Sequence, residues 1–365
     1  MLTTLATLLA VSLTLPQGEG AGQGTGRGQG NSDTTVAVQS GARLDVNNFG
    51  GEIVVRTWNQ NNVRVRASHS SRSRVDVSNS GSTVLVRSTG RRGPPSIVDL
   101  EITVPTWMGM ALNGTYTDIT VENAGGPITA ESVQGDIEVS GGTGNVSLKS
   151  VEGSVILSKT RGRIEVNSVE GDITITQSSG DITVESVDGD IALVGIDATS
   201  VDVNTVDGDI TYDGTIKASG SYRLATHDGD ITVVIPPAAN VSGSLSTFDG
   251  EFDASFAVDT VRAGKHRFTF TVGRGSSPAR LEVETFDGDI NLRRPGEVEL
   301  EMPEHNRNKN QHDHNDDELN LQFDVDGVAQ YAARYAREYA PKYARQYARE
   351  FAPKIARKTA RAISH

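Results

Sequence analysis

The sequence predicts an all-β protein, a single-chain parallel β-solenoid with two sheets and about 18–21 residues per coil, followed by a C-terminal α-helix. Three observations lead to this fold class. Glycines recur every nine residues from Gly126 to Gly189, apolar and polar residues alternate after each glycine, and the period changes to four from Val328. Alternation at period two is typical of a strand with one buried face. Glycine then supplies the turn, because it tolerates positive φ.

The N-terminal residues indicate export. Residues 1–17 hold an apolar stretch that is too short to cross a bilayer as a helix and that ends at Pro16, so we expect a signal peptide. Residues 18–34 are rich in glycine and predict a flexible linker. The chain of 365 residues contains no cysteine, which excludes disulfides, a thiol nucleophile and an acylated cysteine. We therefore expect an exported protein, periplasmic or extracellular at the cell surface.

Residues 35–300 are predicted to form the solenoid. Units of nine residues alternate between two kinds, one of which carries Ser-Val-acid-Gly-Asp-Ile, as in residues 168–173 and 186–191. Apolar residues that follow the glycines should face the core: Ile137, Val139, Val155, Ile173, Ile175 and Ile191. Residues 43–55 predict an opening coil, and about fourteen coils would stack in series. In the later coils the residue before the acid becomes His227, Phe248 or Phe286, which predicts a wider core at that end.

At this point the sequence resembles a bacterial putative-adhesin family of unknown function, built as a β-solenoid. The resemblance rests on Asn-Phe-Gly-Gly-Glu-Ile at residues 48–53, on Ile-Thr-Val-Pro at 102–105, on the repeated Gly-Asp-Ile, and on residues 279–290. It covers about residues 35–294. It implies the fold and offers no catalytic residues. The segment after residue 300 is not part of the family pattern.

Acidic residues flank the turn glycines and form the main candidate site. The residues in question are Glu152, Glu170, Asp188, Asp207, Asp228, Asp249 and Asp287 before the glycine, and Asp136, Asp172, Asp190, Asp209, Asp230, Glu251 and Asp289 after it. One interpretation is a solvated edge, in which acidic side chains stabilise turns and discourage edge pairing. The alternative is a row of Ca²⁺ ions bound by carboxylates. The candidate ligands are Asp172, Asp188, Asp190, Asp207, Asp209, Asp228 and Asp230.

Two further clusters have a plain and a functional interpretation. Arginines crowd residues 56–92, either as ordinary outward strand positions or as a surface for an acidic polymer. With only Trp58 nearby, they do not predict nucleic-acid binding. His305, His312 and His314 lie in a polar stretch, 301–327, which predicts a disordered linker more than a metal site.

The sequence holds no motif of the common hydrolases, metalloproteases or nucleotide-binding loops, so we expect no enzyme. No cofactor is expected, apart from the Ca²⁺ alternative. The predicted function is a non-catalytic surface of the bacterial cell envelope, adhesin-like or scaffolding. The alternatives are an envelope-stress signalling scaffold and a polysaccharide-active β-helix enzyme. The protein or glycan partner is open, and self-association is a further alternative.

Residues 328–365 predict a basic aromatic α-helix. Aromatic residues recur every four positions from Tyr331 to Phe351, among alanine, arginine and lysine, which favour helices. Nine Lys or Arg against two Glu give the segment a net charge of +7, within a chain of −13. Such a helix is typical of contact with an anionic membrane or cell-envelope surface. Packing against the solenoid is the alternative.

Overall fold

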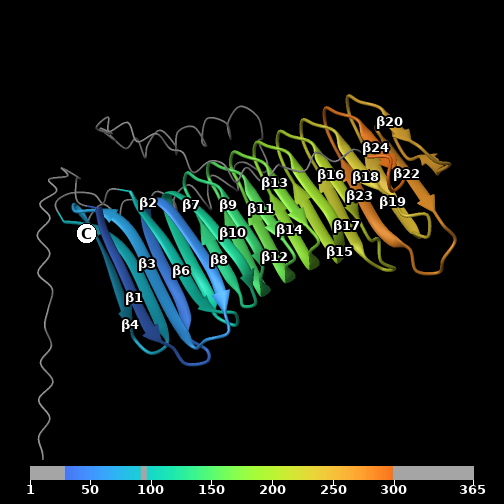
Figure 1. Cartoon of the computed structure of the whole chain (residues 1–365). Coiled ribbons are helices and arrows are strands. Elements are labelled where there is room, and N and C mark those ends of the chain that lie inside the picture. Colours follow the sequence, from blue (N-terminus) through green and yellow to red (C-terminus); the bar gives the residue numbers. More distant parts are fainter. Residues whose placement is uncertain (1–28, 92–96, 299–365) are drawn as a thin grey trace, which may run out of the picture.

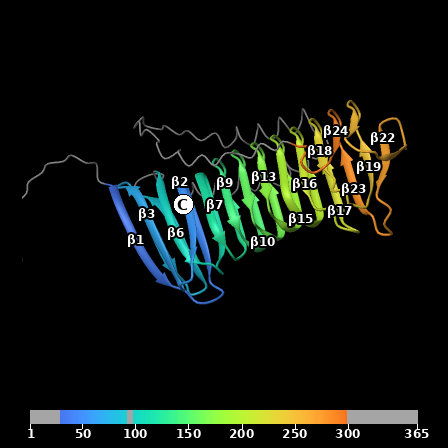
Figure 2. The same ribbon diagram turned by 45° about the vertical axis from the view of Figure 1, so that its right-hand side comes forward.

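The computed structural model describes residues 29–91 and 97–298, and throughout these ranges the regular structure is β (Figure 1). The strands stack side by side along one axis and form an elongated rod (Figures 1 and 2). The predicted fold class needs correction, because the described part of the chain contains no helix. The expected C-terminal helix at 328–365, the signal peptide at 1–17 and the linker at 301–327 lie outside the described residues. Consequently no helix that could span a membrane is found in the described part.

The middle of the rod is a regular coil with two strands per turn. Sheet 1 contains β9 (Ile137–Gly141), β11 (Val155–Ser158) and β13 (Ile173–Thr176). Sheet 2 contains β8 (Ile128–Glu131), β10 (Thr143–Lys149), β12 (Arg161–Asn167) and β14 (Ser179–Glu185). Val155 pairs in parallel with Ile137 on one side and Ile173 on the other, so equivalent residues stack at the 18-residue spacing that the sequence predicts.

Three long strands pass from one sheet to the other and tie the two together. They are β2 (Arg43–Trp58), β7 (Gly109–Ala124) and β15 (Ile191–Asn204). In β15, for example, Ile191 pairs with Ile173 in sheet 1, whereas Val201 pairs with Ile182 in sheet 2. The predicted opening coil is therefore the continuous strand β2.

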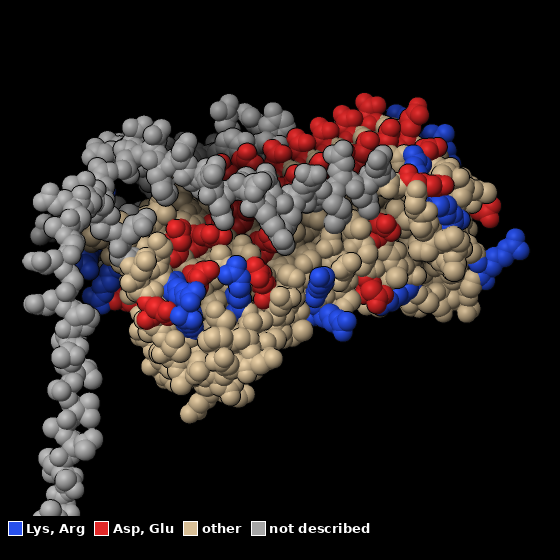
Figure 3. Space-filling model, viewed as in Figure 1, with Lys and Arg blue, Asp and Glu red and all other residues tan. Residues whose placement is uncertain are grey.

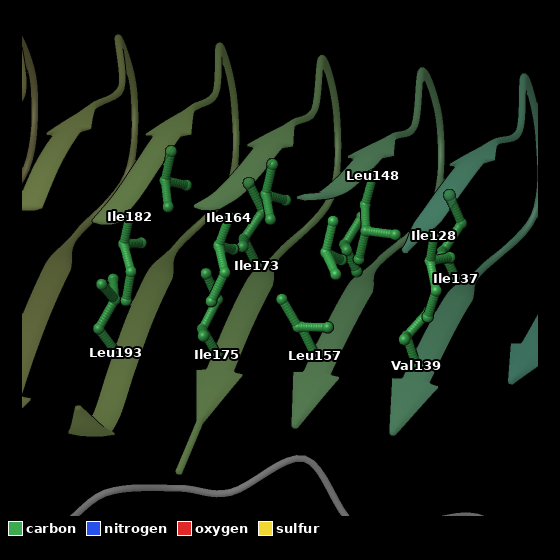
Figure 4. Packing of buried hydrophobic residues seen from close by; sticks show 14 of the residues in the cluster. Ile128, Ile137, Val139, Leu148, Leu157, Ile164, Ile173, Ile175, Ile182 and Leu193 are labelled. Carbon is green, nitrogen blue, oxygen red and sulfur yellow. The ribbon is translucent and has the colours of Figure 1, made fainter. Parts of the chain in front are cut away.

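The core is a narrow apolar seam between the two sheets. Residues at alternate positions point inward and are buried, among them Ile137, Val139, Val155, Ile173, Ile175 and Ile191. Figure 4 shows this seam, with Ile164 and Ile182 in neighbouring coils of sheet 2 and Ile173 coming from sheet 1. The predicted inward positions are thus confirmed. Because each coil contributes few side chains, stability comes from the sum of contacts between neighbouring coils.

The N-terminal end of the rod does not follow chain order. It contains β1 (Gln29–Ala37), β3 (Asn62–Ser70), β4 (Ser73–Asn79), β5 (Thr83–Gly90) and β6 (Val98–Pro105). Strand β2 lies between the coil of β5 and β6 on one side and β7 on the other. After β2, the chain therefore forms β3–β6 at the N-terminal end of the rod. It then returns to the other side of β2 as β7, from which the central coils follow.

The C-terminal end repeats this arrangement. It contains β16 (Ile210–Gly214), β17 (Ser221–Ala225), β18 (Ile231–Val234), β19 (Val241–Ser246), β20 (Phe252–Ala254), β21 (Asp259–Arg262), β22 (Arg267–Val272), β23 (Ala279–Glu284) and β24 (Ile290–Arg293). Strand β23 lies between β17 and β19, and β24 lies between β18 and β20. The last coil in the sequence, β23 and β24, thus lies in space between the coil of β17 and β18 and the coil of β19 and β20. The expectation of coils stacked in series is wrong at both ends.

The ends also contain antiparallel pairs, so the predicted all-parallel solenoid is wrong there. Antiparallel pairing joins β1 to β3, β3 to β6 and β4 to β5 at one end, and β19 to β22 and β21 to β22 at the other. For the two pairs of consecutive strands, β4–β5 and β21–β22, the physical reason is that an antiparallel pair needs only a short turn, whereas a parallel neighbour needs a full coil. Each hairpin also covers an edge that would otherwise offer unpaired backbone groups to another chain.

The wider core of the later coils is filled by residues other than those predicted. Tyr212 and Tyr222 are fully buried, with ring centroids 5.8 Å apart, and Phe270 is buried beside Gly243. The Tyr222 hydroxyl donates to the carbonyl oxygen of Ala198 at 2.8 Å, so its polar group is satisfied inside the core. Burial raises the pKa of both tyrosines.

The seam predicts a sharp contrast between adjacent positions of β14. Ile182→Lys places a charge in the core and should lower the free energy of unfolding by about 3–5 kcal/mol, because the buried charge has no partner. Thr183→Lys lies on the outer face between Glu165 and Asp202 of the neighbouring coils and should leave stability unchanged or slightly raised. Chemical denaturation of both variants measures the difference, and equal losses would contradict the register.

Candidate functional site

The turn that enters each strand of sheet 1 is the most regular feature of the surface. Its glycines have φ between +120° and +143° at positions 135, 153, 171, 189, 208, 229 and 288. A Cβ added at Gly171 would lie 2.6 Å from the carbonyl oxygen of Gly153, and Gly189 stands in the same relation to Gly171. Only glycine therefore allows neighbouring coils to approach at this turn. The acidic residues that flank these glycines form what we call the acidic edge (Figure 3).

The carboxylates after the glycine bind the backbone of the next coil. The Asp172 Oδ1 accepts the N–H of Asp190 at 3.0 Å, and the Asp190 Oδ1 accepts the N–H of Asp209 at 2.8 Å. Five more aspartates accept a backbone N–H of a neighbouring coil through Oδ1 at 2.7–2.9 Å. These acceptor and donor pairs are Asp118 with Asp136, Asp136 with Ser154, Asp209 with Asp230, Asp230 with Asp289, and Asp289 with Glu251. The ladder breaks at Ser154, where a hydroxyl replaces the carboxylate. These acids therefore satisfy backbone donors that the tight turn leaves open.

The acids before the glycine have a different environment. Their backbones form isolated parallel bridges from coil to coil, as between Glu170 and Asp188. The side chains of Glu152, Glu170 and Asp207 are exposed, and that of Asp188 is half-buried. This column therefore presents carboxylates outward at the spacing of the coils, about 4.8 Å.

Burial and neighbouring like charges both act on the carboxyl groups of this edge. Burial, followed by the neighbouring charges of Asp207, Asp172 and Asp190, raises the pKa of Asp188 above 3.8. The pKa of Asp209 is also raised, by burial and then by its acidic neighbours, although the Asp230 amide opposes the rise. Since the folded state holds these protons more tightly than the unfolded chain, both groups favour folding below pH 3.8. That contribution is lost as the pH rises through the raised pKa.

Serine and threonine residues complete the turn, and the sequence analysis assigned them no role. The Thr226 hydroxyl donates to the carbonyl oxygens of Asp228 and Gly208, both at 3.1 Å, and Thr285 bonds Asp287 in the same way at 3.3 Å. Corresponding bonds start from Ser168, Ser186 and Thr205. The signal in the sequence is a hydroxyl residue three positions before each turn glycine.

The candidate calcium ligands separate into two groups. Asp172, Asp190, Asp209 and Asp230 belong to the ladder and use Oδ1 to bind backbone amides. The other three, Asp188, Asp207 and Asp228, lie before the glycine. Among the described residues, no three acidic or histidine side chains come close enough together to hold a metal ion. Calcium binding stays a prediction. The three linker histidines lie outside the described residues.

A stack of four aromatic rings continues the edge at the C-terminal end. The ring of Phe286 lies 4.9 Å from that of His227 and 4.8 Å from that of Phe248, and Phe248 lies 4.5 Å from His266, all in stacked geometry. Phe248 is 55% exposed and Phe286 48%. The prediction that these residues widen the core is therefore wrong. At the same position, one residue before the acid, Val151, Val169 and Val187 are partly exposed, although Val206 is buried.

The N-terminal arginines are largely paired with carboxylates. Arg64 binds Asp33 through two bonds, of 2.5 and 2.9 Å, and Arg56 binds Glu101 at 3.2 Å and Glu122 at 3.3 Å. A shallow hollow of about 230 Å³ lies over these groups, lined by Arg56, Trp58, Arg64, Arg66, Glu101, Ile102 and Thr103. Because positive and negative groups alternate across the strands, this face presents little net charge to an acidic polymer.

Comparison with known proteins points to one family. The family described as Toastrack DUF4097 matches residues 42–293. Among solved structures, a putative adhesin from Parabacteroides distasonis is 7% identical, covers 72% of this chain and 97% of its own, and has a TM-score of 0.41. A putative lipid binding protein from the same organism is 10% identical, covers 72% of this chain and 96% of its own, and has a TM-score of 0.39. A putative adhesin from Bacteroides fragilis is 17% identical, covers 73% of this chain and 98% of its own, and has a TM-score of 0.34. A search of curated proteins gave no match.

The carboxylate ladder predicts different effects for two substitutions at one position. Asp190→Ala removes the acceptor of the Asp209 N–H and should cost about 1 kcal/mol of stability, because that donor loses its partner. Asp190→Asn keeps an Oδ1 acceptor and removes a like charge, so it should melt at or above the wild-type temperature. Calorimetry at neutral pH compares the two. If both variants melt together, the carboxylate does not serve the backbone.

Proposed function

This chain belongs to the Toastrack DUF4097 family, and on that premise we propose that it is a non-catalytic interaction surface of the bacterial cell envelope. Its role would be that of an adhesin-like or scaffolding rod. The observation that carries the proposal is the acidic edge, on which exposed carboxylates repeat at coil spacing along a straight scaffold. Localisation outside the cytoplasm belongs to the same proposal and agrees with the apolar N-terminal residues.

The geometry of the edge favours binding of an extended cationic or hydrogen-bonding partner. Carboxylates about 4.8 Å apart repel one another, and this repulsion adds to burial in raising the pKa of Asp188. A partner with matching donors would relieve this repulsion and gain from many weak contacts at once. The edge is straight because each turn is fixed by its glycine, its hydroxyl residue and its backbone bridge. Such a surface suits a basic protein segment or an amino-bearing glycan.

A non-catalytic role is supported by how the carboxylates are used. Hydrolysis of a glycosidic bond needs one carboxyl group that gives up a proton and another that stays free to act on the sugar or on water. The post-glycine aspartates of this edge accept backbone amides, from Asp136 through Asp289. The pre-glycine acids line one column and face outward. The arrangement therefore suits binding over a long surface.

The proposal predicts that purified protein binds envelope preparations of its own organism through the acidic edge. The test variant combines Glu152→Gln, Glu170→Gln, Asp188→Asn and Asp207→Asn. It should reduce binding about tenfold, because it removes four outward charges from consecutive coils. Co-sedimentation at low and high salt measures the bound fraction.

The matched control removes four acids from the sheet faces: Glu131→Gln, Glu138→Gln, Glu165→Gln and Glu185→Gln. It changes the net charge by the same amount and should bind like the wild type. Equal binding by both variants would show that the edge is not the surface. Release of soluble sugar from the envelopes would contradict a non-catalytic role.

A further inference from the structure

The exposed aromatic stack at the C-terminal end differs from the rest of the acidic edge. Its members come from three separate coils and a hairpin, so their contacts depend on the interleaved order of β18, β24 and β20. Two stacked phenylalanine rings with about half of their surface exposed are unusual on a protein surface that has no partner. This patch, His227, Phe248, His266 and Phe286, is called the ring stack.

Carboxylates lie next to three of the four rings, whereas His266 stands between Lys265 and Arg267 in the sequence. Asp228, Asp249 and Asp287 directly follow His227, Phe248 and Phe286 in the sequence, and all three acids are exposed. A second acid lies two positions after each of these aspartates, on the other side of the turn glycine: Asp230, Glu251 and Asp289. Aromatic faces and edges beside negative charge form a surface for cationic and aromatic side chains together. The same end already holds one such contact, since the Arg294 guanidinium lies 3.6 Å from the centroid of Phe256.

The chain itself carries a segment with the complementary chemistry. Residues 328–365 combine a charge of +7 with aromatic residues at every fourth position from Tyr331 to Phe351. This segment follows the coil of β24, which also holds Phe286 at the centre of the stack. The sequence predicts a disordered linker at residues 301–327, and a flexible tether of the 29 residues from 299 to 327 would reach about 30 Å. Such a tether would hold the basic segment near the stack at an effective concentration of about millimolar.

We infer that residues 328–365 dock on the ring stack and its flanking carboxylates within the same molecule. Docking covers the exposed rings with tyrosine and alanine side chains and neutralises the acids with arginine and lysine. This inference does not depend on the envelope function proposed above, which concerns the acids of the central coils.

Limited trypsin digestion of the full chain tests the inference, because the basic segment holds nine cleavable residues. In the wild type at low salt, cleavage within 328–365 should be about tenfold slower than in Phe248→Ser/Phe286→Ser. Asp228→Asn/Asp249→Asn/Asp287→Asn keeps the rings and the turns and should speed cleavage in the same way, as should high salt. Trp107→Ser removes an exposed aromatic residue elsewhere and should digest like the wild type.

Three results would overturn the inference. Cleavage at the wild-type rate in both edge variants would show that the segment does not use this surface. Protection that rises with protein concentration would assign the segment to a second copy of the chain. Protection that appears only after phosphatidylglycerol vesicles are added would assign it to a membrane. Mass spectrometry also shows whether trypsin cleaves the β21–β22 hairpin of the phenylalanine variant, which would mean that this end of the rod has unfolded. In that case the cleavage rate of the asparagine variant alone tests the inference.

Discussion

The close approach of successive glycine turns is the constraint on which the rest of the structure depends. The carbonyl oxygen of Gly153 occupies the space that a side chain at Gly171 would need, and the same holds for Gly171 and Gly189. This approach sets the coil spacing and aligns the inward isoleucines and valines in one seam. It also leaves turn amides that the post-glycine aspartates accept. The acidic character of the edge is thus first a consequence of how the coils stack, and its outward column is what remains for binding.

The interleaved order of the end coils is a second feature on which the structure depends. It leaves open edges in place, since β1, β4, β20 and β21 each pair with a single strand in the described part of the chain. At one end β5 and β6 lie outside β2, which precedes them in the sequence. At the other end β19 and the β21–β22 hairpin lie outside β23, which follows them in the sequence. The same arrangement brings Phe286 between His227 and Phe248, although Phe286 is last of the three in the sequence. The ring stack therefore exists only because the end is built out of order.

Much of the central rod was predictable, because a nine-residue glycine spacing and period-two alternation leave one register for residues such as Ile173. The order of the end coils was not. Gly-Asp-Ile at 288–290 and Gly-Glu-Phe at 250–252 fit the same turn, and nothing local distinguishes which lies nearer the middle. The aromatic residues were misplaced because a ring after a run of valines indicates burial, whereas the position itself is partly or fully exposed in most coils. Tyr212 and Tyr222 fill the core instead, at positions where the alternation had already indicated an inward side chain.

The most direct test of the glycine constraint compares two alanine substitutions. Gly171 has φ +120° and would place its Cβ against the Gly153 carbonyl, whereas Gly144 has φ +84° with no atom within 4 Å of its Cβ. Gly144→Ala should cost only the backbone term of about 1–2 kcal/mol. Gly171→Ala should cost at least twice as much, measured as the free energy of unfolding by denaturant titration, because two coils must move apart. Equal losses in the two variants would contradict the account.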